Sequence, residues 1–399
     1  MKRKINVKKF LDFPFIFVII PSEIQSEGFI MLVKIKTFVK KEAVLCISAL
    51  CAVITMFLIP PSAEYIEYID FRVLCLLFSL MGVVAGFKSV GAFKWLTYQL
   101  LRHIKNGRVL GLTLVLLPFF ASMLVTNDVA LLVFVPFTML LLSGLGCEKS
   151  IIPIIVMQTV AANLGSMATP VGNPQNLFLY SAFNLGAGEF FSVTLPLTAV
   201  SLVCLSLCTL PIMPRSLPEQ SLKKENIASG KKMAVYAVLF VLCLLTVFRV
   251  VPYQATTVVL IIALLIIDRK LLGGIDYMLL LTFVCFFIIS ENIGRVEAVR
   301  GFLQNLLSQN TLLTSVGASQ VISNVPAAVL LSGFTDNWRE LLSGVNIGGL
   351  GTPIASLASL ITLKLYMNTK GARVMKFLGI FTVANIIGLA ILLGFEMIV

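Results

Sequence analysis

The sequence predicts an all-α polytopic membrane protein, because it is apolar, poorly charged and organised in long hydrophobic blocks. Of its 399 residues, 58% are hydrophobic and 13% are charged, and the mean hydropathy is +0.99. Soluble domains usually carry about a quarter charged residues, roughly twice this share. The composition excludes a soluble enzyme, a secreted disulfide scaffold and a disordered protein.

Four apolar blocks have the length of a membrane-spanning helix, which needs about 17–25 residues. These blocks cover residues 43–59, 191–210, 233–251 and 377–398. With the apolar segments between them, we expect nine complete spans and two re-entrant helical hairpins. The eight cysteines lie in or beside apolar segments without a C-x-x-C pair, so we interpret them as small hydrophobic residues.

The basic residues predict the orientation of the chain, because cytoplasmic loops carry an excess of Lys and Arg. With the N-terminus inside, 26 of the 31 Lys and Arg fall in the inside segments 1–42, 88–108, 144–150, 211–232, 268–276 and 364–376. The net charge of +12 therefore reflects topology and not nucleic-acid binding. We expect a multi-pass protein of the cytoplasmic membrane, with the N-terminus inside and the C-terminus outside.

We divide the chain into four parts. They are a basic N-terminal segment (1–42), a first repeat (43–210), a cytoplasmic linker (211–232), and an extra span followed by a second repeat (233–399). Because a second basic start begins at Met31, we interpret residues 1–30 as an upstream extension or an interfacial segment.

Two polar clusters and two irregular segments occur in the same order in both halves. The clusters read TND at 126–128 and SNV at 323–325, and each is expected at the tip of a re-entrant hairpin. The irregular segments share the motif N-x-G-x-x-[A/G]-T-P, at 163–170 and 346–353. Because lipid offers no hydrogen-bond partners, this Gly- and Pro-rich backbone must break a transmembrane helix inside the protein.

The topology count places the two repeats in opposite orientations. An amphipathic segment precedes each polar cluster, at 88–108 on the inside and at 292–309 on the outside. Inverted repeats with two broken transmembrane helices are typical of secondary transporters, whose sites form where the breaks meet. The alternative is that Gly, Pro and small polar residues only aid helix packing.

The sequence resembles an ion-transporter superfamily that includes divalent-anion/sodium symporters, citrate carriers, arsenite permeases and sodium/proton antiporters of the arsenite-permease type. The resemblance rests on TNDVALLVFVPF, ANLGSMATPVGNPQN, SNVPA and GVNIGGLGTPIASLASLI, and covers residues 43–399. It implies elevator-like alternating access, a homodimer, and one cation held between each tip and its facing break. The dicarboxylate branch commonly has Ser-Asn-Thr tips, so the Thr-Asn-Asp tip is more similar to the arsenite-permease and antiporter branch.

The expected site residues supply amides, hydroxyls and exposed backbone groups. For the substrate they are Thr126, Asn127, Asn173, Asn176, Ser323, Asn324 and Thr352. For cation binding or proton coupling they are Asp128, Asn163, Gly165, Thr169, Asn346 and Gly348. Oxygen ligands of this kind suit Na⁺, whereas the N–H groups at half-helix N-termini suit an anion.

Asp128 is the one carboxylate inside an apolar block of the predicted membrane region. Such a group is costly near the bilayer centre and is usually functional. It could neutralise Na⁺, or bind and release a proton. The alternative is that Asp128 is the N-cap of the returning helix.

The sequence therefore predicts a secondary active transporter for a small inorganic or carboxylate anion, coupled to Na⁺ or H⁺. A sodium/proton antiporter or an arsenite-type efflux permease is the alternative within the class, and an ion channel is the alternative outside it. An enzyme is not expected, because Asp128 has no facing Asp and His103 is the single histidine. The expected partners are the small anion, the lipid bilayer and a second copy, without a cofactor or a metal other than Na⁺.

Overall fold

The computed structural model describes residues 38–39, 42–101, 104, 106–216, 227–369 and 371–398. Most of the predicted N-terminal segment, His103 and the middle of the predicted linker lie outside these residues. The chain divides into two units, residues 1–47 and 48–399. The described part of the first unit includes the first residues of α2. The features below belong to the second unit.

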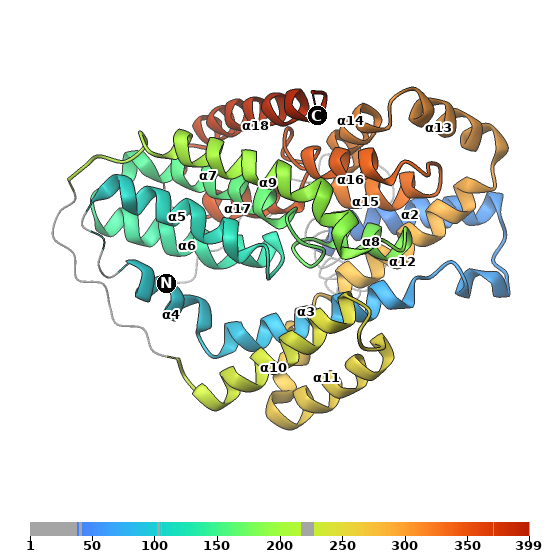
Figure 1. Cartoon of the computed structure of the whole chain (residues 1–399), viewed down its shortest axis with the longest axis horizontal. Helices are drawn as coiled ribbons and strands as arrows, with labels where there is room; N and C mark the ends of the chain where they lie inside the picture. The colour runs from blue at the N-terminus through green and yellow to red at the C-terminus, as the bar shows by residue number, and fades with distance from the viewer. Residues whose placement is uncertain are drawn as a thin grey trace, which may run out of the picture. The chain divides into compact units, whose positions relative to one another are not determined.

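Helices make up the regular structure of the described residues, with one isolated β-bridge between Asn106 and Ser216 (Figure 1). In chain order the elements are α2 (Ala43–Leu58), η2 (Ala63–Ile66), α3 (Phe71–Ser89), α4 (Ala92–Leu101), α5 (Gly107–Ala121), α6 (Asn127–Gly144), α7 (Glu148–Ser166), α8 (Pro174–Ala182), α9 (Ala187–Thr209), α10 (Gly230–Val247), α11 (Tyr253–Asp268), η3 (Arg269–Gly274), α12 (Tyr277–Gly294), α13 (Glu297–Gln309), α14 (Thr311–Ile322), α15 (Asn324–Ser332), α16 (Trp338–Ile347), α17 (Leu357–Met367) and α18 (Val374–Glu396).

Within the described residues, six helical segments are long and apolar enough to cross a membrane, so the chain is a polytopic membrane protein. They are η2 with α3, then α6, α9, α10, α12 and α18. We expected nine complete spans by sequence. The two numbers do not compare directly, because the six include α6, which was expected in a hairpin, and because each expected broken span is divided into two helices. Helices α2, α5, α14 and α17 are apolar but shorter.

The two predicted amphipathic helices begin later than expected, because neighbouring helices extend into the predicted segments. Helix α3 continues to Ser89, and α4 begins at Ala92 and is described to Leu101. Likewise α12 continues to Gly294, and the amphipathic helix α13 begins at Glu297.

Two groups of helices are distinguished by their packing (Figure 1). In the α3 group, α3 packs against α10, α11 and η3. The α7 group contains α5–α9 and α14–α18, in which α7 packs against α5, α6, α9, α17 and α18. Helix α12 contacts both α3 and α15, while α4 and α13 connect segments of the two groups.

Glycines allow close helix packing in the α3 group. A Cβ at Gly86 would lie 2.7 Å from the ring of Tyr236 on α10. A Cβ at Gly82 would lie 2.9 Å from Leu264 on α11. Small residues of this kind let the backbones of membrane helices approach each other, which is their main source of packing contact in lipid.

Buried polar side chains connect helices within the α7 group. Gln158 on α7 donates to the carbonyl of Leu114 on α5 and to the hydroxyl of Thr138 on α6, both at 2.8 Å. The hydroxyl of Thr159 donates to that of Thr362 on α17 at 2.8 Å. Hydrogen bonds between membrane helices each contribute about 0.6–2 kcal/mol.

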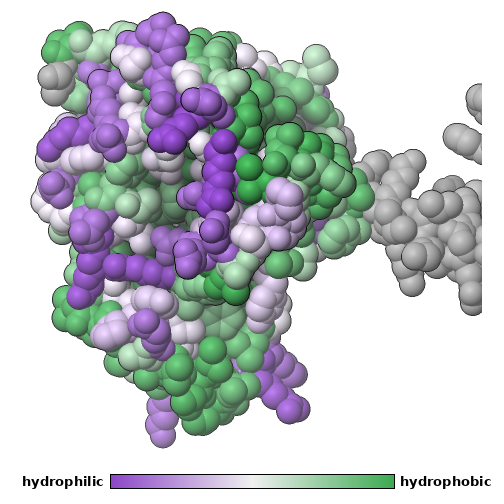
Figure 2. Space-filling view, turned by 90° about the vertical axis from the view of Figure 1, so that its right-hand side faces the viewer, coloured by the Kyte–Doolittle hydropathy of each residue, from purple (hydrophilic) through white to green (hydrophobic). Residues whose placement is uncertain are grey.

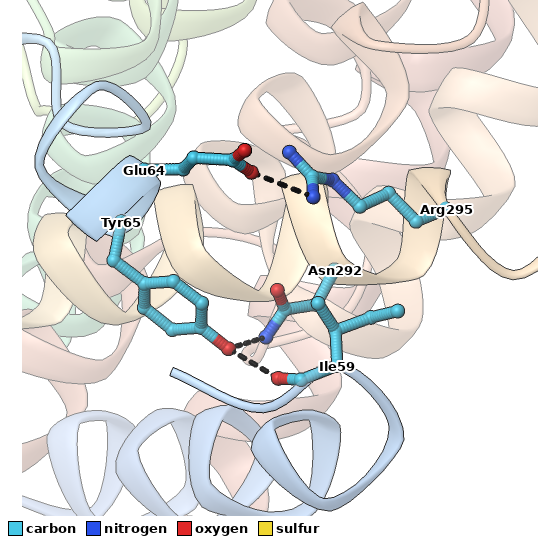
Figure 3. Close-up of polar contacts among 5 residues, drawn as sticks. All are labelled: Ile59, Glu64, Tyr65, Asn292 and Arg295. Atoms are coloured by element: carbon cyan, nitrogen blue, oxygen red, sulfur yellow. Dashed lines mark hydrogen bonds and ion pairs between the residues drawn. The ribbon is translucent and has the colours of Figure 1, made fainter. Parts of the chain in front are cut away.

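A polar network joins the end of α12 to the turn between α2 and α3 (Figure 3). The Nδ2 of Asn292 donates to the hydroxyl of Tyr65 at 2.9 Å, and that hydroxyl donates to the carbonyl of Ile59. Arg295 pairs with Glu64 at 3.0 Å. This ion pair is exposed, so it contributes little to stability. The buried Asn292 network is therefore the main connection.

Figure 2 views the molecule from the side at which η2 and α13 lie in Figure 1. Hydrophilic residues gather across the left and centre of this view, and hydrophobic residues cover its lower part and its upper right. Such a separation is expected where polar helix ends leave the apolar region of a membrane.

Asn292→Ala is expected to lower the stability of the protein by about 1 kcal/mol, the usual contribution of a buried hydrogen bond. The substitution removes the bonds to Tyr65 and to the hydroxyl of Thr55, at 3.1 Å. Thermal unfolding of the purified protein measures this effect. Asn305→Ala on the exposed side of α13 is the control and should leave the unfolding temperature unchanged. Equal unfolding temperatures for both variants would contradict the structural role of Asn292.

Candidate functional site

Two helices of the α7 group are interrupted by irregular segments, which we call the first and second breaks. The first break, residues 167–173, separates α7 from α8 and contains Pro170 and Gly172. The second break, residues 348–356, separates α16 from α17 and contains Gly351, at a φ of +109°, and Pro353. Proline cannot donate a backbone hydrogen bond, and a positive φ favours glycine, so both segments stop the preceding helix.

The tip of a helix pair contacts each break through the same backbone bond. The N–H of Asn127, at the start of α6, donates to the carbonyl of Gly172 at 3.2 Å. The N–H of Asn324, at the start of α15, donates to the carbonyl of Ala355 at 2.9 Å. Gly172 and Ala355 both lie nine positions after the Asn that begins their motif. The structure thus brings each polar cluster onto the break of its own half.

Corresponding side chains also join each break to the end of the helix that precedes the other break. The Oδ1 of Asn163 in the first motif accepts from the hydroxyl of Ser356 at 3.0 Å. The Oδ1 of Asn346 in the second motif accepts from the Nδ2 of Asn173 at 3.3 Å. Ser356 and Asn173 each lie ten positions after their motif Asn. We call these two bonds, and the four residues that make them, the crossed asparagine pair.

Further hydrogen bonds, donated by Asn side-chain amides, hold the crossed asparagine pair in place. The Nδ2 of Asn127 donates to the Oδ1 of Asn163 at 3.0 Å, and the Nδ2 of Asn163 donates to the carbonyl of Gly349 at 3.3 Å. The Nδ2 of Asn346 donates to the Oδ1 of Asn176 at 2.7 Å. These Asn side chains are buried, so each hydrogen bond offsets the cost of removing an amide from water.

The hydroxyls of Thr169 and Thr352 bond to backbone and not to one another. Thr169 donates to the carbonyl of Met123, and Thr352 donates to the carbonyl of Gln320 at 3.1 Å. Met123 and Gln320 both lie four positions before the Asn of their tip. We predicted Thr169 for the cation and Thr352 for the substrate, and the structure uses both hydroxyls to hold a break against the helix before its tip.

Gly165 and Gly348 lie where the helix before each tip packs closely against the backbone of α7 or the start of the second break. A Cβ at Gly165 would lie 2.8 Å from the hydroxyl of Ser122, and one at Gly348 would lie 2.7 Å from that of Ser319. Both serines lie five positions before the Asn of their tip. We predicted these glycines as cation-binding residues, and their geometry in the structure is that of close packing.

Ser323 joins α14 to α15 as a single residue with a φ of +74°. A serine in this left-handed region is strained, and strain of this kind is concentrated at functional sites. The hydroxyl of Ser323 donates to the carbonyl of Ala355 at 3.3 Å. The contact holds the strained turn on the second break.

Asp128 lies in the first turn of α6, whose N-cap is Thr126, so the alternative that Asp128 is the N-cap was wrong. The backbone N–H of Asp128 donates to the Oδ1 of Asn127 at 2.9 Å. The Oδ1 of Asp128 is buried and has no hydrogen-bond partner among the described residues. This oxygen is free to bind a proton or a cation.

Four helix N-termini converge on a cavity of about 10 Å³, enough for one water-sized occupant. The first residues of α6, α8, α15 and α17 line it, namely Asn127, Pro174, Asn324 and Leu357. Helix N-termini carry partial positive charge, and here the N–H groups of Asn127 and Asn324 already donate to the breaks. Asp128 and Ser356 line the same cavity, so acceptor oxygens lie beside this positive potential.

A larger cavity of about 500 Å³ leads away from this point, between α3, η3 and α12 on one side and α6 and α8 on the other. Asp128 lines both cavities, and Asn173 also lines the larger one. Its charged lining residues further include Lys88, Lys270 and Asp276.

Two site residues, Gln320 and Ser356, were absent from the predicted set. The Nε2 of Gln320 donates to the carbonyls of Gly348 and Leu350, both at 2.9 Å, and its Oε1 accepts from the N–H of Thr352 at 2.9 Å. A Gln within the apolar segment before the SNV cluster was the signal for this role. For Ser356, the signal was its position after the second motif, matching Asn173 after the first.

A family model described as Citrate transporter matches residues 29–336. The chain belongs to this family. The match covers most of the chain, including the first break, both tips and the α3 group. It confirms the predicted resemblance and identifies the chain as a transporter and not an enzyme.

Similar proteins support this identification. A protein of Methanocaldococcus jannaschii, named as an uncharacterized transporter, is 33% identical over 336 residues, which cover 84% of this chain and 92% of the relative. The inner membrane protein YbiR of Escherichia coli is 31% identical over 301 residues, 74% of this chain and 80% of the relative. The silicon efflux transporter LSI3 of Oryza sativa subsp. japonica is 30% identical over 167 residues, 41% of this chain and 34% of the relative.

Gly172→Ala is expected to destabilise the first break by about 3 kcal/mol, the upper range for overpacking. The added Cβ would lie 2.1 Å from the carbonyl oxygen of Ser166 and 2.8 Å from that of Ser122. A thermal unfolding scan should show a clear decrease in the midpoint.

Gly188→Ala on α9 is the matched control, because a Cβ there meets nothing within 4 Å. Its unfolding midpoint should equal that of the unchanged protein. If Gly172→Ala unfolds at the same temperature as this control, the break does not pack as described.

Proposed function

We propose that the chain is a secondary active carrier that moves a small inorganic or carboxylate anion, coupled to Na⁺ or H⁺. The observation that carries the proposal is the convergence of the helices α6, α8, α15 and α17 on one small cavity. Their dipoles favour an anion, and the amide and hydroxyl oxygens beside them suit a cation. Transporters of this type bind substrate at paired broken helices.

The pairing of equivalent contacts supports two inverted repeats, each with a re-entrant hairpin and a broken transmembrane helix. The pairs α5–α6 and α14–α15 are the proposed hairpins, with tips at Asn127 and Asn324. The N–H of each tip bonds to the same motif position, and the crossed asparagine pair relates the two breaks reciprocally. Two halves with unrelated folds would not be expected to form hydrogen bonds at the same motif positions.

The large cavity is the proposed path of the anion from the cytoplasm. In the orientation expected from the basic residues, Lys88 and Lys270 are on the inside, and both line this cavity. Positive side chains that line a cavity raise the local concentration of anions. The described conformation is therefore proposed to be open to the cytoplasm.

Alternating access is proposed to move the α7 group against the α3 group, in the manner of an elevator. Arg249, after the end of α10, donates to the carbonyls of Tyr180 and Asn184 at the end of α8, both at 3.1 Å. The movement would break these two bonds. We further propose that two copies form a homodimer in the cytoplasmic membrane, with the C-terminus outside.

A sodium/proton antiporter is the second candidate, and the unpartnered Oδ1 of Asp128 favours it. In that case Asp128→Asn would abolish exchange of Na⁺ for H⁺ in proteoliposomes that contain no other anion than chloride. An anion carrier without antiport activity would show no such exchange before the substitution. A channel would instead give currents far above the turnover of a carrier.

Asn127→Ala and Asn324→Ala are each expected to reduce anion uptake by at least about tenfold. Each removes an amide at the small cavity, and a hydrogen bond to a charged ligand contributes about 1.5–3 kcal/mol. Uptake of labelled citrate, succinate, sulfate or arsenite into proteoliposomes, driven by an imposed Na⁺ or H⁺ gradient, measures this loss.

The control for these two variants is Asn305→Ala, which should transport normally. All variants are compared after confirming equal amounts of folded protein in the vesicles. Unchanged uptake in both Asn127→Ala and Asn324→Ala would place the substrate site elsewhere.

A further inference from the structure

A basic cavity outside the transport site lies where α6 and α17 end and α7 and α18 begin. Its volume is about 420 Å³. The charged residues that line it are Glu148, Lys149, Arg373 and Lys376. None of these four forms an ion pair with another described residue. The cavity therefore has an excess of positive charge that the described chain does not neutralise.

An apolar groove of about 560 Å³ lies along α18 and is also lined by α7 and α9. Its lining consists of apolar side chains, cysteines and glycines, with Ser201 as the one hydroxyl. Ser201 donates to the carbonyl of Leu197, so the groove offers no unsatisfied polar group to a ligand. It is suited to a hydrocarbon chain.

The basic cavity and the apolar groove share one face of α18. Lys376 lines the cavity, and Gly379, Ile380, Val383 and Ile387 line the groove. Residues three, four, seven and eleven positions apart lie on one helix face. A Cβ at Gly379 would meet nothing within 4 Å, so the missing side chain keeps the groove open beside the cavity.

We propose that these two features form one binding site for an anionic glycerophospholipid. The headgroup phosphate binds in the basic cavity to Lys149, Arg373 and Lys376, and an acyl chain lies in the groove along α18. Basic pockets between membrane helices at an interface bind anionic headgroups in this way. The proposal does not depend on the transport function.

Charge favours a lipid over a second copy of the chain in this place. A two-fold symmetric contact brings the same surface of both copies together. It would set the three cations of one copy near those of the other, which is unfavourable. An anionic lipid supplies both the negative charge and the apolar chain that the site lacks.

The headgroup part is tested with the purified full chain in a neutral detergent. Native mass spectrometry measures binding of palmitoyl-oleoyl phosphatidylglycerol and of the matching phosphatidylcholine. Phosphatidylglycerol should bind more tightly, and the double variant Arg373→Gln/Lys376→Gln should bind it about 25-fold more weakly, about fivefold for each charge. The control Lys231→Gln/Lys232→Gln removes two charges from the start of α10 and should bind as the unchanged protein. If the double variant does not fold, Lys149→Gln replaces it.

The acyl part is tested with Gly379→Leu, whose Cβ meets nothing within 4 Å and whose side chain would occupy the groove. It should weaken phosphatidylglycerol binding severalfold. Gly394→Leu is the control on the same helix, because it is equally open but lies outside the groove. Equal binding of the two lipids would overturn the proposal. It would also be overturned if inorganic phosphate displaced the lipid completely. The same holds if Gly379→Leu lowered the fraction of dimer and left lipid binding unchanged.

Discussion

Backbone amides inside a membrane protein need partners, and this requirement is most severe where a buried helix is interrupted. Each break described here leaves the first N–H groups of a new helix without an intrahelical acceptor. Backbone carbonyls of the breaks accept from the first N–H groups of α6 and α15, and the Oδ1 of Asn173 accepts from the N–H of Asn176 at the start of α8. The crossed asparagine pair adds side-chain hydrogen bonds between the two halves, since Asn amides can donate and accept at once.

This pairing explains why the surrounding helices are arranged as they are. Two helix tips bond to the breaks, and glycines at Gly165 and Gly348 let the preceding helices approach. Four helix N-termini then point at one small cavity. No Lys or Arg of the described chain lines this small cavity. Helix dipoles and amides supply positive potential there, while Asp128 and a hydroxyl supply negative potential.

Much of this could be predicted from the sequence, because repeated motifs with identical spacing predict repeated contacts. The helical membrane fold followed from composition. The transporter family and the contact of each tip with its break were implied by the resemblance that the TND, SNV and N-x-G-x-x-[A/G]-T-P patterns carry. The crossed asparagine pair did not, because it joins side chains of separate repeats and depends on tertiary packing. Thr169, Thr352 and Gln320 show the same limit, since a polar side chain does not reveal whether it faces a ligand or a backbone carbonyl.

Ligand-dependent thermal stability of the purified protein tests most directly whether the small cavity and the larger cavity beside it bind an anion together with a cation. Unfolding midpoints are measured with citrate, succinate, sulfate and arsenite, each with Na⁺ and with choline in its place. A ligand that binds only the folded state raises its stability, by about 2.7 kcal/mol at a concentration of 100 Kd. We expect one anion class to raise the midpoint only when Na⁺ is present, or only at low pH if H⁺ replaces Na⁺. A midpoint that no anion changes under either condition would contradict an ion-coupled anion site.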